Sequence, residues 1–131
     1  MKPEEYTLLV VDDNEDNRDV LSRRLVKKGF QVLVAEGGRR ALELVESQPV
    51  DLVLLDIMMP EMNGIETLQE LRKTRSPAEL PVIMATAKTE SEDVVQALEL
   101  GANDYVTKPI NFPIVLARVQ AQLRLKKARR T

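Results

Sequence analysis

Four charged residues stand directly after predicted strands, and their side-chain types suit the chemistry of phosphoryl groups. Asp12 and Asp13 follow the first apolar run of the chain, Asp56 follows the third, and Lys108 follows the last. An aspartate at the end of a buried strand is unfavourable unless it is solvated, paired or bound to a metal. Three neighbouring carboxylates attract a hard divalent cation, and Mg²⁺ suits them because it takes few protein ligands and keeps several waters. Lysine is a common ligand of phosphate oxygens. The four residues therefore predict a site for Mg²⁺ and a phosphoryl group.

Each of these residues has a plainer explanation when it is taken alone. A single charged residue at a strand end usually serves only to solvate a loop. Thr86, which ends another apolar run, is explained by the β-propensity of threonine, although its hydroxyl could donate to a phosphoryl oxygen. Two adjacent aspartates, a third on a neighbouring strand and a lysine held between a strand end and Pro109 are better explained by one shared site.

The composition of the chain describes an ordinary globular domain. With 131 residues the chain is long enough for one domain with its own core. The formal net charge of -2 argues against a general nucleic-acid-binding surface. The absence of cysteine and histidine excludes thiolate and imidazole chemistry, including a phosphohistidine on this chain. No apolar stretch approaches the ~20 residues of a membrane span, and the first residues lack the apolar segment of a secretory signal. We expect a cytoplasmic protein that neither enters a membrane nor binds nucleic acid directly.

The hydrophobic pattern alternates between short apolar runs and segments with helical spacing. Short runs bounded by turn or charged residues are typical of strands buried on both faces of a sheet. We expect strands at Tyr6–Val11, Phe30–Ala35, Leu52–Leu55, Val82–Ala85 and Tyr105–Val106. We expect helices near residues 15–28, 39–47, 64–74 and 90–100, and from about residue 112. The first helix is expected to turn Val20, Leu21 and Leu25 toward the core, and the fourth Val94 and Leu98.

Five strand–helix units predict an α/β fold with a doubly wound, five-stranded parallel sheet and helices on both faces. Ligands of such folds bind at the carboxyl edge of the sheet, where the direction of winding reverses. In the flavodoxin-like strand order 2-1-3-4-5, the reversal lies between strands 1 and 3. These two strands end in Asp12, Asp13 and Asp56, while strands 4 and 5 bring Thr86 and Lys108 to the same edge. Topology and side-chain chemistry thus indicate the same place for the site.

The most specific segment is the loop Asp56–Gly64, which contains a Met-Pro pair and ends in Asn-Gly. The chain resembles the receiver domains of bacterial two-component response regulators. The matching motifs are this loop, Val11-Asp12-Asp13, Thr86-Ala87 and Tyr105-Val106-Thr107-Lys108-Pro109. They occur in order and cover nearly the whole chain. Each motif is short, but together they are highly specific.

The resemblance implies a role for each acidic residue. Asp56 would be the phosphoacceptor, which attacks a phosphohistidine of a partner kinase to give an acyl phosphate. Asp13 and Asp56 would bind Mg²⁺ directly, with Asp12 helping through a water. The backbone carbonyl of Met58 would be a further ligand. Phosphoryl transfer needs in-line positioning and charge neutralisation, and these groups supply both.

The resemblance also implies how the phosphoryl group is held and sensed. Thr86 and Lys108 would hold its oxygens, and the Lys108–Pro109 bond would be cis. Tyr105 would move as Thr86 is drawn toward the phosphoryl group, although Tyr105 alone is also explained as an ordinary strand aromatic.

Two positions beside the site bear on the lifetime of the acyl phosphate. In the family, the positions of Met58 and Lys88 influence how fast this group hydrolyses. Met58 cannot orient a water well, which suggests slow or moderate autodephosphorylation.

The expected function is a phosphorylation switch that changes protein contacts. It would assist its own phosphorylation and dephosphorylation but would not be a turnover enzyme on an external substrate. Its partners would be a sensor histidine kinase or phosphotransfer protein, and a second copy bound through the face of the fourth helix, fifth strand and fifth helix. Residues 1–125 would form the receiver domain, and 126–131 a basic tail in which a linker helix to an output domain could begin.

Two alternatives remain open at this point. An aspartate-nucleophile phosphatase also forms an aspartyl phosphate, but it typically carries a second aspartate two residues after the one that ends the first strand. Asn14 occupies that slot after Asp12, and Arg18 and Arg24 complete no substrate pocket that the sequence identifies. The other alternative is an interaction module that works without phosphorylation, which the complete set of site residues disfavours.

Overall fold

Five parallel strands form one sheet in the order β2-β1-β3-β4-β5, so the predicted fold class and strand order are confirmed. The computed structural model describes residues 2–87 and 91–129. The strands are β1 (Thr7–Val11), β2 (Gln31–Ala35), β3 (Leu52–Asp56), β4 (Val82–Ala87) and β5 (Asp104–Lys108). The helices are α1 (Glu15–Lys27), α2 (Gly38–Ser47), α3 (Gly64–Arg72), α4 (Ser91–Glu99) and α5 (Phe112–Arg129), after a short 3-10 helix, η1 (Pro3–Glu5).

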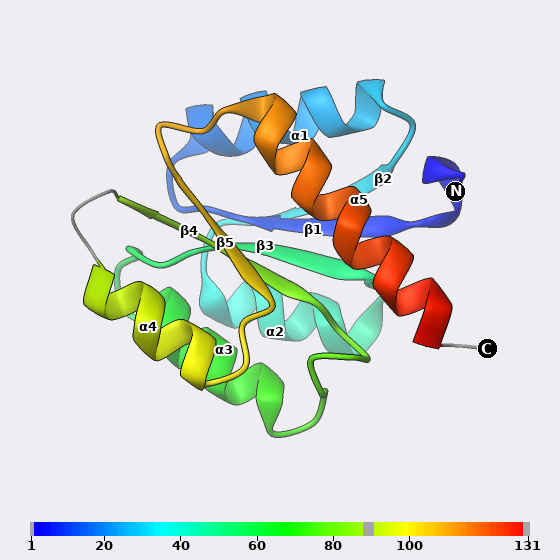
Figure 1. Cartoon of the computed structure of the whole chain (residues 1–131). Coiled ribbons are helices and arrows are strands. Elements are labelled where there is room, and N and C mark those ends of the chain that lie inside the picture. The colour runs from blue at the N-terminus through cyan, green and yellow to red at the C-terminus, as the bar shows by residue number, and fades with distance from the viewer. Residues whose placement is uncertain (1, 88–90, 130–131) are drawn as a thin grey trace.

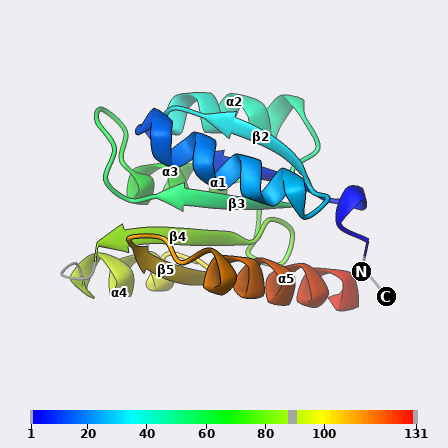
Figure 2. The same cartoon turned by 90° about the horizontal axis from the view of Figure 1, so that it is seen from above.

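The sheet separates two hydrophobic cores. Helices α1 and α5 cover one face, and α2, α3 and α4 cover the other (Figures 1 and 2). Successive side chains of a strand point to opposite faces. Leu8 and Val10 of β1 therefore join the core beneath α1 and α5, while Leu9 and Val11 join the core beneath α2 and α3. Both faces of the central strands are buried, which explains their uninterrupted apolar sequences.

The last strand is longer than its sequence pattern predicts. Only Val106 is buried in β5, because this strand lies at the edge of the sheet. Pairing with β4 nevertheless extends the strand from Asp104, opposite Ile83, to Lys108, opposite Ala87. The partner strand therefore carries Lys108 to the carboxyl edge.

Two helices each expose a side chain that the sequence pattern predicts to face the core. Val20 of α1 and Leu98 of α4 are exposed and not part of the core. Helix α1 uses Leu21 and Leu25 as its core face, and Val20 lies on the solvent side of that face. Helix α4 lies against α3 and β4 near the edge of the sheet, so its buried face is narrow and only Ala97 is fully enclosed.

Helix α5 runs on to Arg129 and is anchored near its end. The Lys126 ammonium is nearly buried, and its Nζ lies 3.2 Å from the backbone oxygen of Asp51 and 3.4 Å from its Oδ1. The other carboxylate oxygen of Asp51 accepts the backbone N–H of Thr7 at 2.8 Å. Lys126 therefore ties α5 to the starts of β1 and β3.

The loop after β3 returns tightly to the strand it has just left. The N–H of Gly64 donates to the carbonyl of Ile57 at 2.8 Å. A Cβ on Gly64 would overlap the carbonyl oxygen of Asp56 and would lie 2.7 Å from the Cα of Ile57. Helix α3 then begins with a capping box, in which Asn63 and Glu66 exchange side-chain and backbone hydrogen bonds. Only glycine therefore lets the helix start this close to the strand end.

We expect Gly64→Ser to lower the free energy of unfolding by about 1–3 kcal/mol, because the added atoms meet backbone that cannot move aside. Chemical denaturation followed by circular dichroism measures the change. Gly37→Ser is the matched control, since a Cβ there meets nothing within 4 Å and serine is a favourable residue at the N-cap of α2. Equal stabilities of the two variants would contradict the close approach at Gly64.

Candidate functional site

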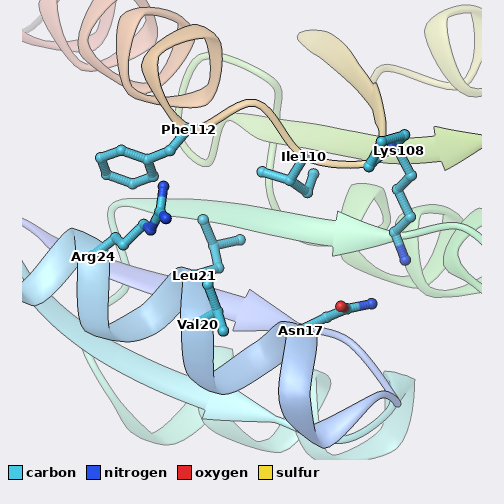
Figure 3. Close-up of a pocket in the computed structure, with 8 residues that line it drawn as sticks. Asn17, Val20, Leu21, Arg24, Lys108, Ile110 and Phe112 are labelled. Carbon is cyan, nitrogen blue, oxygen red and sulfur yellow. The ribbon is translucent and has the colours of Figure 1, made fainter.

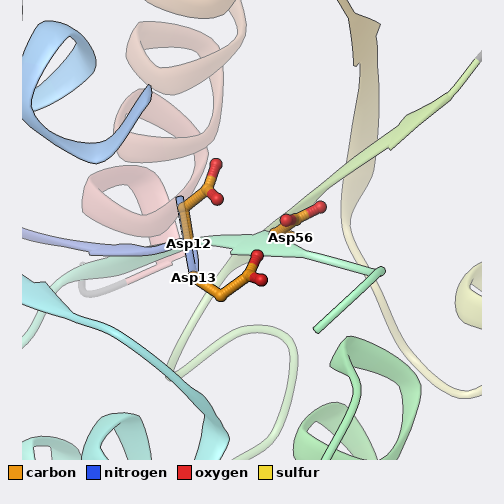
Figure 4. Close-up of side chains that lie close together, drawn as sticks. All are labelled: Asp12, Asp13 and Asp56. Atoms are coloured by element: carbon orange, nitrogen blue, oxygen red, sulfur yellow. The ribbon is translucent and has the colours of Figure 1, made fainter. Parts of the chain in front are cut away.

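Three aspartates gather at the carboxyl edge of β1 and β3. Asp12 and Asp13 follow β1, and Asp56 is the last residue of β3. One carboxylate oxygen of each lies within 4.8 Å of the others (Figure 4). Asp12 and Asp56 are buried, at 8% and 4% exposure, whereas Asp13 is exposed. The predicted acidic cluster is therefore present, with one of its members open to solvent.

Lys108 reaches this cluster from β5. Its Nζ lies 3.0 Å from Oδ2 of Asp56 and 3.4 Å from Oδ2 of Asp12. The Lys108–Pro109 peptide bond is cis, as the family resemblance implies. Three carboxylates against one ammonium leave two formal negative charges at the site. A divalent cation with oxygen ligands matches both this charge and these donors, so the residues fit Mg²⁺.

Asn14 holds the carboxylate of Asp12, and Arg18 holds its backbone, although the sequence does not assign either residue to the site. The N–H of Asn14 donates to Oδ1 of Asp12 at 2.9 Å, and Nη1 of Arg18 donates to its backbone oxygen at 2.9 Å. Asn14 also caps α1 by accepting the N–H of Asn17. The capping pattern is visible in the sequence, but nothing there shows that the same turn orients Asp12.

Burial of Asp56 decides the electrostatics of the site. Desolvation raises the pKa of Asp56 from its ordinary value of 3.8 to about 6, although Lys108 and the backbone N–H of Met58 act in the opposite direction. Burial alone would lower the pKa of Lys108, but its contacts with Asp56 and Asp12 outweigh burial and raise that pKa. Lys108 therefore stays charged, while it compensates the buried Asp56 only in part.

Thr86 and Tyr105 lie on the neighbouring strands β4 and β5. Thr86, at the end of β4, is buried, and its hydroxyl donates to the carbonyl of Ala87 at 3.3 Å. Tyr105 lies on β5 and is 37% exposed. The side chain of Met58, next to the acidic cluster, is exposed. Lys88, the second position linked to phosphoryl lifetime, lies outside the described residues.

A groove of about 580 Å³ leads to Lys108 between α1 and the segment that follows β5. Asn17 and Lys108 point toward one another at one end of this groove, and Arg24 and Phe112 lie at the other (Figure 3). The guanidinium of Arg24 lies 5.7 Å from the centre of the Phe112 ring, a cation–π contact that joins α1 to α5. The groove thus runs from the Arg24–Phe112 contact to Lys108 at the edge of the sheet.

Comparison with known proteins identifies the class. The family model of the response regulator receiver domain matches residues 8–120, and the chain belongs to this family. Transcriptional regulatory protein CpxR of Klebsiella pneumoniae subsp. pneumoniae (strain HS11286) is 49% identical over 117 residues, which are 89% of this chain and 49% of CpxR. The uncharacterized transcriptional regulatory protein YrkP of Bacillus subtilis (strain 168) is 45% identical over 119 residues, 91% of this chain and 50% of YrkP. The chain thus spans about half the length of these curated relatives.

Solved structures share the fold over almost the whole chain. The CheY-like response regulator receiver domain protein from Methanospirillum hungatei JF-1 matches with a TM-score of 0.88 at 30% identity. The match covers 95% of this chain and 98% of that one. Within the described residues, no helix has the length and apolar character needed to cross a membrane.

The raised pKa of Asp56 predicts a pH-dependent stability. The folded chain holds a proton on Asp56 more tightly than the unfolded chain does, so this carboxyl lowers the free energy of unfolding as the pH rises from about 4 to about 6. We expect Asp56→Asn to be about 1–3 kcal/mol more stable than the wild type at pH 7.5, since one pKa unit corresponds to about 1.4 kcal/mol. The difference should disappear near pH 3.5. Urea denaturation at the two pH values measures it.

The pH dependence of Mg²⁺ binding is a second test of the raised pKa of Asp56. The ion should raise the melting temperature of the wild type more at pH 7.5 than at pH 5, because protons compete for Asp56. Asp13→Asn should weaken this effect, whereas Asp16→Asn, an exposed carboxylate on α1, should not. Equal Mg²⁺ effects at both pH values would contradict the assignment.

Proposed function

We propose that this receiver domain is a phosphorylation-dependent signalling switch in which Asp56 accepts the phosphoryl group. One observation carries this proposal. The buried carboxylate of Asp56 lies 3.0 Å from the Lys108 ammonium and within 4.8 Å of the carboxylates of Asp12 and Asp13. A nucleophile, a cation for phosphoryl oxygens and a set of metal ligands are therefore together at one edge of the sheet.

In the proposed reaction the carboxylate of Asp56 attacks the phosphorus of a phosphohistidine on a sensor histidine kinase or phosphotransfer protein. A P–O bond forms, the P–N bond breaks, and the imidazole nitrogen of the donor leaves with the bonding electron pair. The nucleophile must be ionised, and a pKa of about 6 leaves most of Asp56 ionised at neutral pH. The Lys108 ammonium would pair with the Asp56 carboxylate before the transfer and with the phosphoryl oxygens after it.

Asp13, Asp56 and the backbone carbonyl of Met58 would hold Mg²⁺ directly, and Asp12 would hold it through a water. The bound ion would neutralise negative charge on the carboxylates and on the transferring phosphoryl group. The exposure of Asp13 supports this role, because a ligand at the surface leaves room for the waters that Mg²⁺ retains.

Thr86 would report the phosphoryl group to the rest of the domain. Its hydroxyl makes only a 3.3 Å bond to the neighbouring carbonyl of Ala87. A phosphoryl oxygen is a stronger, charged acceptor, so the hydroxyl would exchange one bond for the other. Movement of Thr86 would open space at the end of β4, and Tyr105 on the neighbouring β5 would turn inward from its present half-exposed position.

The output would be changed contacts on the face of α4, β5 and α5, to a partner protein or to a second copy. This face carries Ile114, which is exposed, and an ion pair of 3.0 Å between Arg118 and Asp104. Phosphorylation can shift such contacts only by the free energy with which the phosphoryl group prefers one conformation, typically a few kcal/mol. The expected response is a shifted equilibrium.

A phosphatase that acts on an external substrate is the less well supported interpretation of the same aspartates. Arg18 binds the backbone of Asp12, and Arg24 lies over Phe112, so both guanidinium groups are engaged in the protein itself. The proposed switch would act in the cytoplasm. Residues 1–125 would form the phosphoacceptor domain, and a linker helix to an output domain could begin in the basic tail 126–131.

We expect acetyl phosphate with Mg²⁺ to add one phosphoryl group to the chain, because Asp56 is the more deeply buried of the two carboxylates that contact Lys108 and the nearer to its ammonium, at 3.0 Å against 3.4 Å for Asp12. Intact-mass spectrometry measures the addition, which alkali should remove. Asp56→Asn should abolish it, and Asp13→Asn should slow it by about 10–100-fold through lost metal affinity. Asp16→Asn is the control for removing an exposed carboxylate nearby. Continued labelling of Asp56→Asn would place the acceptor elsewhere.

A second prediction concerns Thr86 as the relay, meaning the residue that transmits phosphorylation of Asp56 to the α4–β5–α5 face. Beryllofluoride, which mimics the phosphoryl group, should strengthen self-association of the wild type at the α4–β5–α5 face, and Thr86→Ala should lose this response while still binding the mimic. Sedimentation velocity measures association, and fluorine NMR measures binding of the mimic. Thr107→Ala is the matched control, since Thr107 is the exposed β5 neighbour of Thr86 in the sheet register. If Thr86→Ala responds like the wild type, Thr86 is not the relay.

A further inference from the structure

A second groove, away from the acidic cluster, runs between α1 and the edge strand β2. It has a volume of about 640 Å³, and we call it the basic groove. Its apolar part includes Val20, Val26 and Val34, and its charged part consists of Arg23, Arg24 and Lys27. Among the described residues that line it, none carries a carboxylate. The groove is therefore both apolar and positively charged.

Three of the four valines that line the basic groove are exposed, although valine is usually a core residue. Val20 and Val26 are 53% and 55% exposed, and Val34 is 44% exposed. Strand β2 is the end strand of the sheet and pairs only with β1 in the described part of the chain. Contiguous apolar surface framed by charge is typical of a site where another protein docks.

The same chain carries a surface of opposite character on α4. Glu92, Val95 and Glu99 are spaced three and four residues apart, so they form one stripe along the helix, and Leu98 lies beside it. We call these four residues the acidic stripe. Val95 and Leu98 are 54% and 43% exposed, because α4 turns Ala97 toward the core. The acidic stripe thus pairs exposed apolar side chains with two carboxylates.

We infer that the acidic stripe of one copy of this chain docks into the basic groove of a second copy. Glutamates would face Arg23 and Lys27, while Val95 and Leu98 would cover the exposed valines. Charge complementarity selects this pairing. Groove against groove would oppose cations to cations, and stripe against stripe would oppose anions to anions, so a symmetric contact through either surface is disfavoured.

The two surfaces cannot meet within one molecule. The basic groove lies at the β2 end of the sheet, whereas α4 lies near the β4–β5 end (Figure 2). The contact is therefore head-to-tail, and each added copy leaves one groove and one stripe free for the next. A contact made by one short helix belongs to the small, transient class of interfaces, below about 1,200 Å². Association should be weak, open-ended and sensitive to salt.

This inference goes beyond the proposed switch and does not require phosphorylation. Helix α4 also belongs to the face proposed for the phosphorylation-dependent contact, so one α4 can engage in only one of the two associations. The test is made with Asp56→Asn and without phosphodonor, which separates its outcome from that of the proposed function.

The experiment uses charge reversal in both surfaces, with sedimentation velocity over a range of concentrations in 0.1 M salt. The groove variant carries Arg23→Glu and Lys27→Glu, and the stripe variant carries Glu92→Lys and Glu99→Lys. Each alone should lower the association constant by about tenfold or more, because attraction becomes repulsion. An equimolar mixture of the two variants should associate again, and so should one chain with all four substitutions. In 1 M salt the parent should associate less, since the screening length falls to about 3 Å.

Two further measurements keep the inference open to refutation. Arg124→Glu with Lys127→Glu makes the same charge change on the exposed side of α5 and should leave association unchanged. Circular dichroism establishes that every variant is folded. The inference is overturned if the parent stays monomeric at millimolar concentration. The groove would then be a binding site for a different protein. It is also overturned if the groove variant associates like the parent, as a symmetric α4–β5–α5 dimer would.

Discussion

The contact of Lys108 with the buried carboxylates of Asp56 and Asp12 is the interaction on which the site depends. Two carboxylates that leave water together are strongly unfavourable unless a cation stays within a few ångströms of them. Lys108 meets this need only in part, since the pKa of Asp56 remains raised to about 6 in spite of the 3.0 Å ion pair. The remaining negative charge and the carboxylate oxygens match what a divalent cation such as Mg²⁺ requires of its ligands.

The fold supplies the distances that this interaction requires. Asp12, Asp56 and Lys108 belong to β1, β3 and β5, which a parallel sheet brings to one edge although they are far apart in the sequence. Strand β4 stands between Asp56 and Lys108, so only a long side chain that starts at the strand end can span the gap. Gly64 keeps the loop after Asp56 close to the strand, and Lys126 holds α5 at the opposite end of the sheet. These contacts help to fix the strand ends on which the site depends.

The sequence predicts the acidic cluster and its lysine because strand ends in a parallel sheet share one edge, so the position of a residue in its strand is nearly its position in space. Side-chain direction on helices is harder to predict. Val20 and Leu98 face solvent because each lies beside the buried stripe of its helix, and one residue of rotation separates the two outcomes. Contacts between distant residues, such as Lys126 with Asp51 at a separation of 75 residues, leave no local pattern at all.

Helix α1 connects the proposed head-to-tail association with the proposed phosphoryl transfer to Asp56. Val20 and Arg24 line both the groove that leads to Lys108 and the basic groove beside β2. An α4 helix seated in the basic groove would cover these side chains, and a phosphodonor approaching Asp56 over α1 would need the same surface. The second copy and the phosphodonor would therefore compete, since each can bind α1 only where the other is absent. Head-to-tail association would then slow phosphorylation at high protein concentration. Phosphodonor binding would in turn weaken the association of the chains. The coupling free energy is the same for both effects, because thermodynamic linkage is reciprocal.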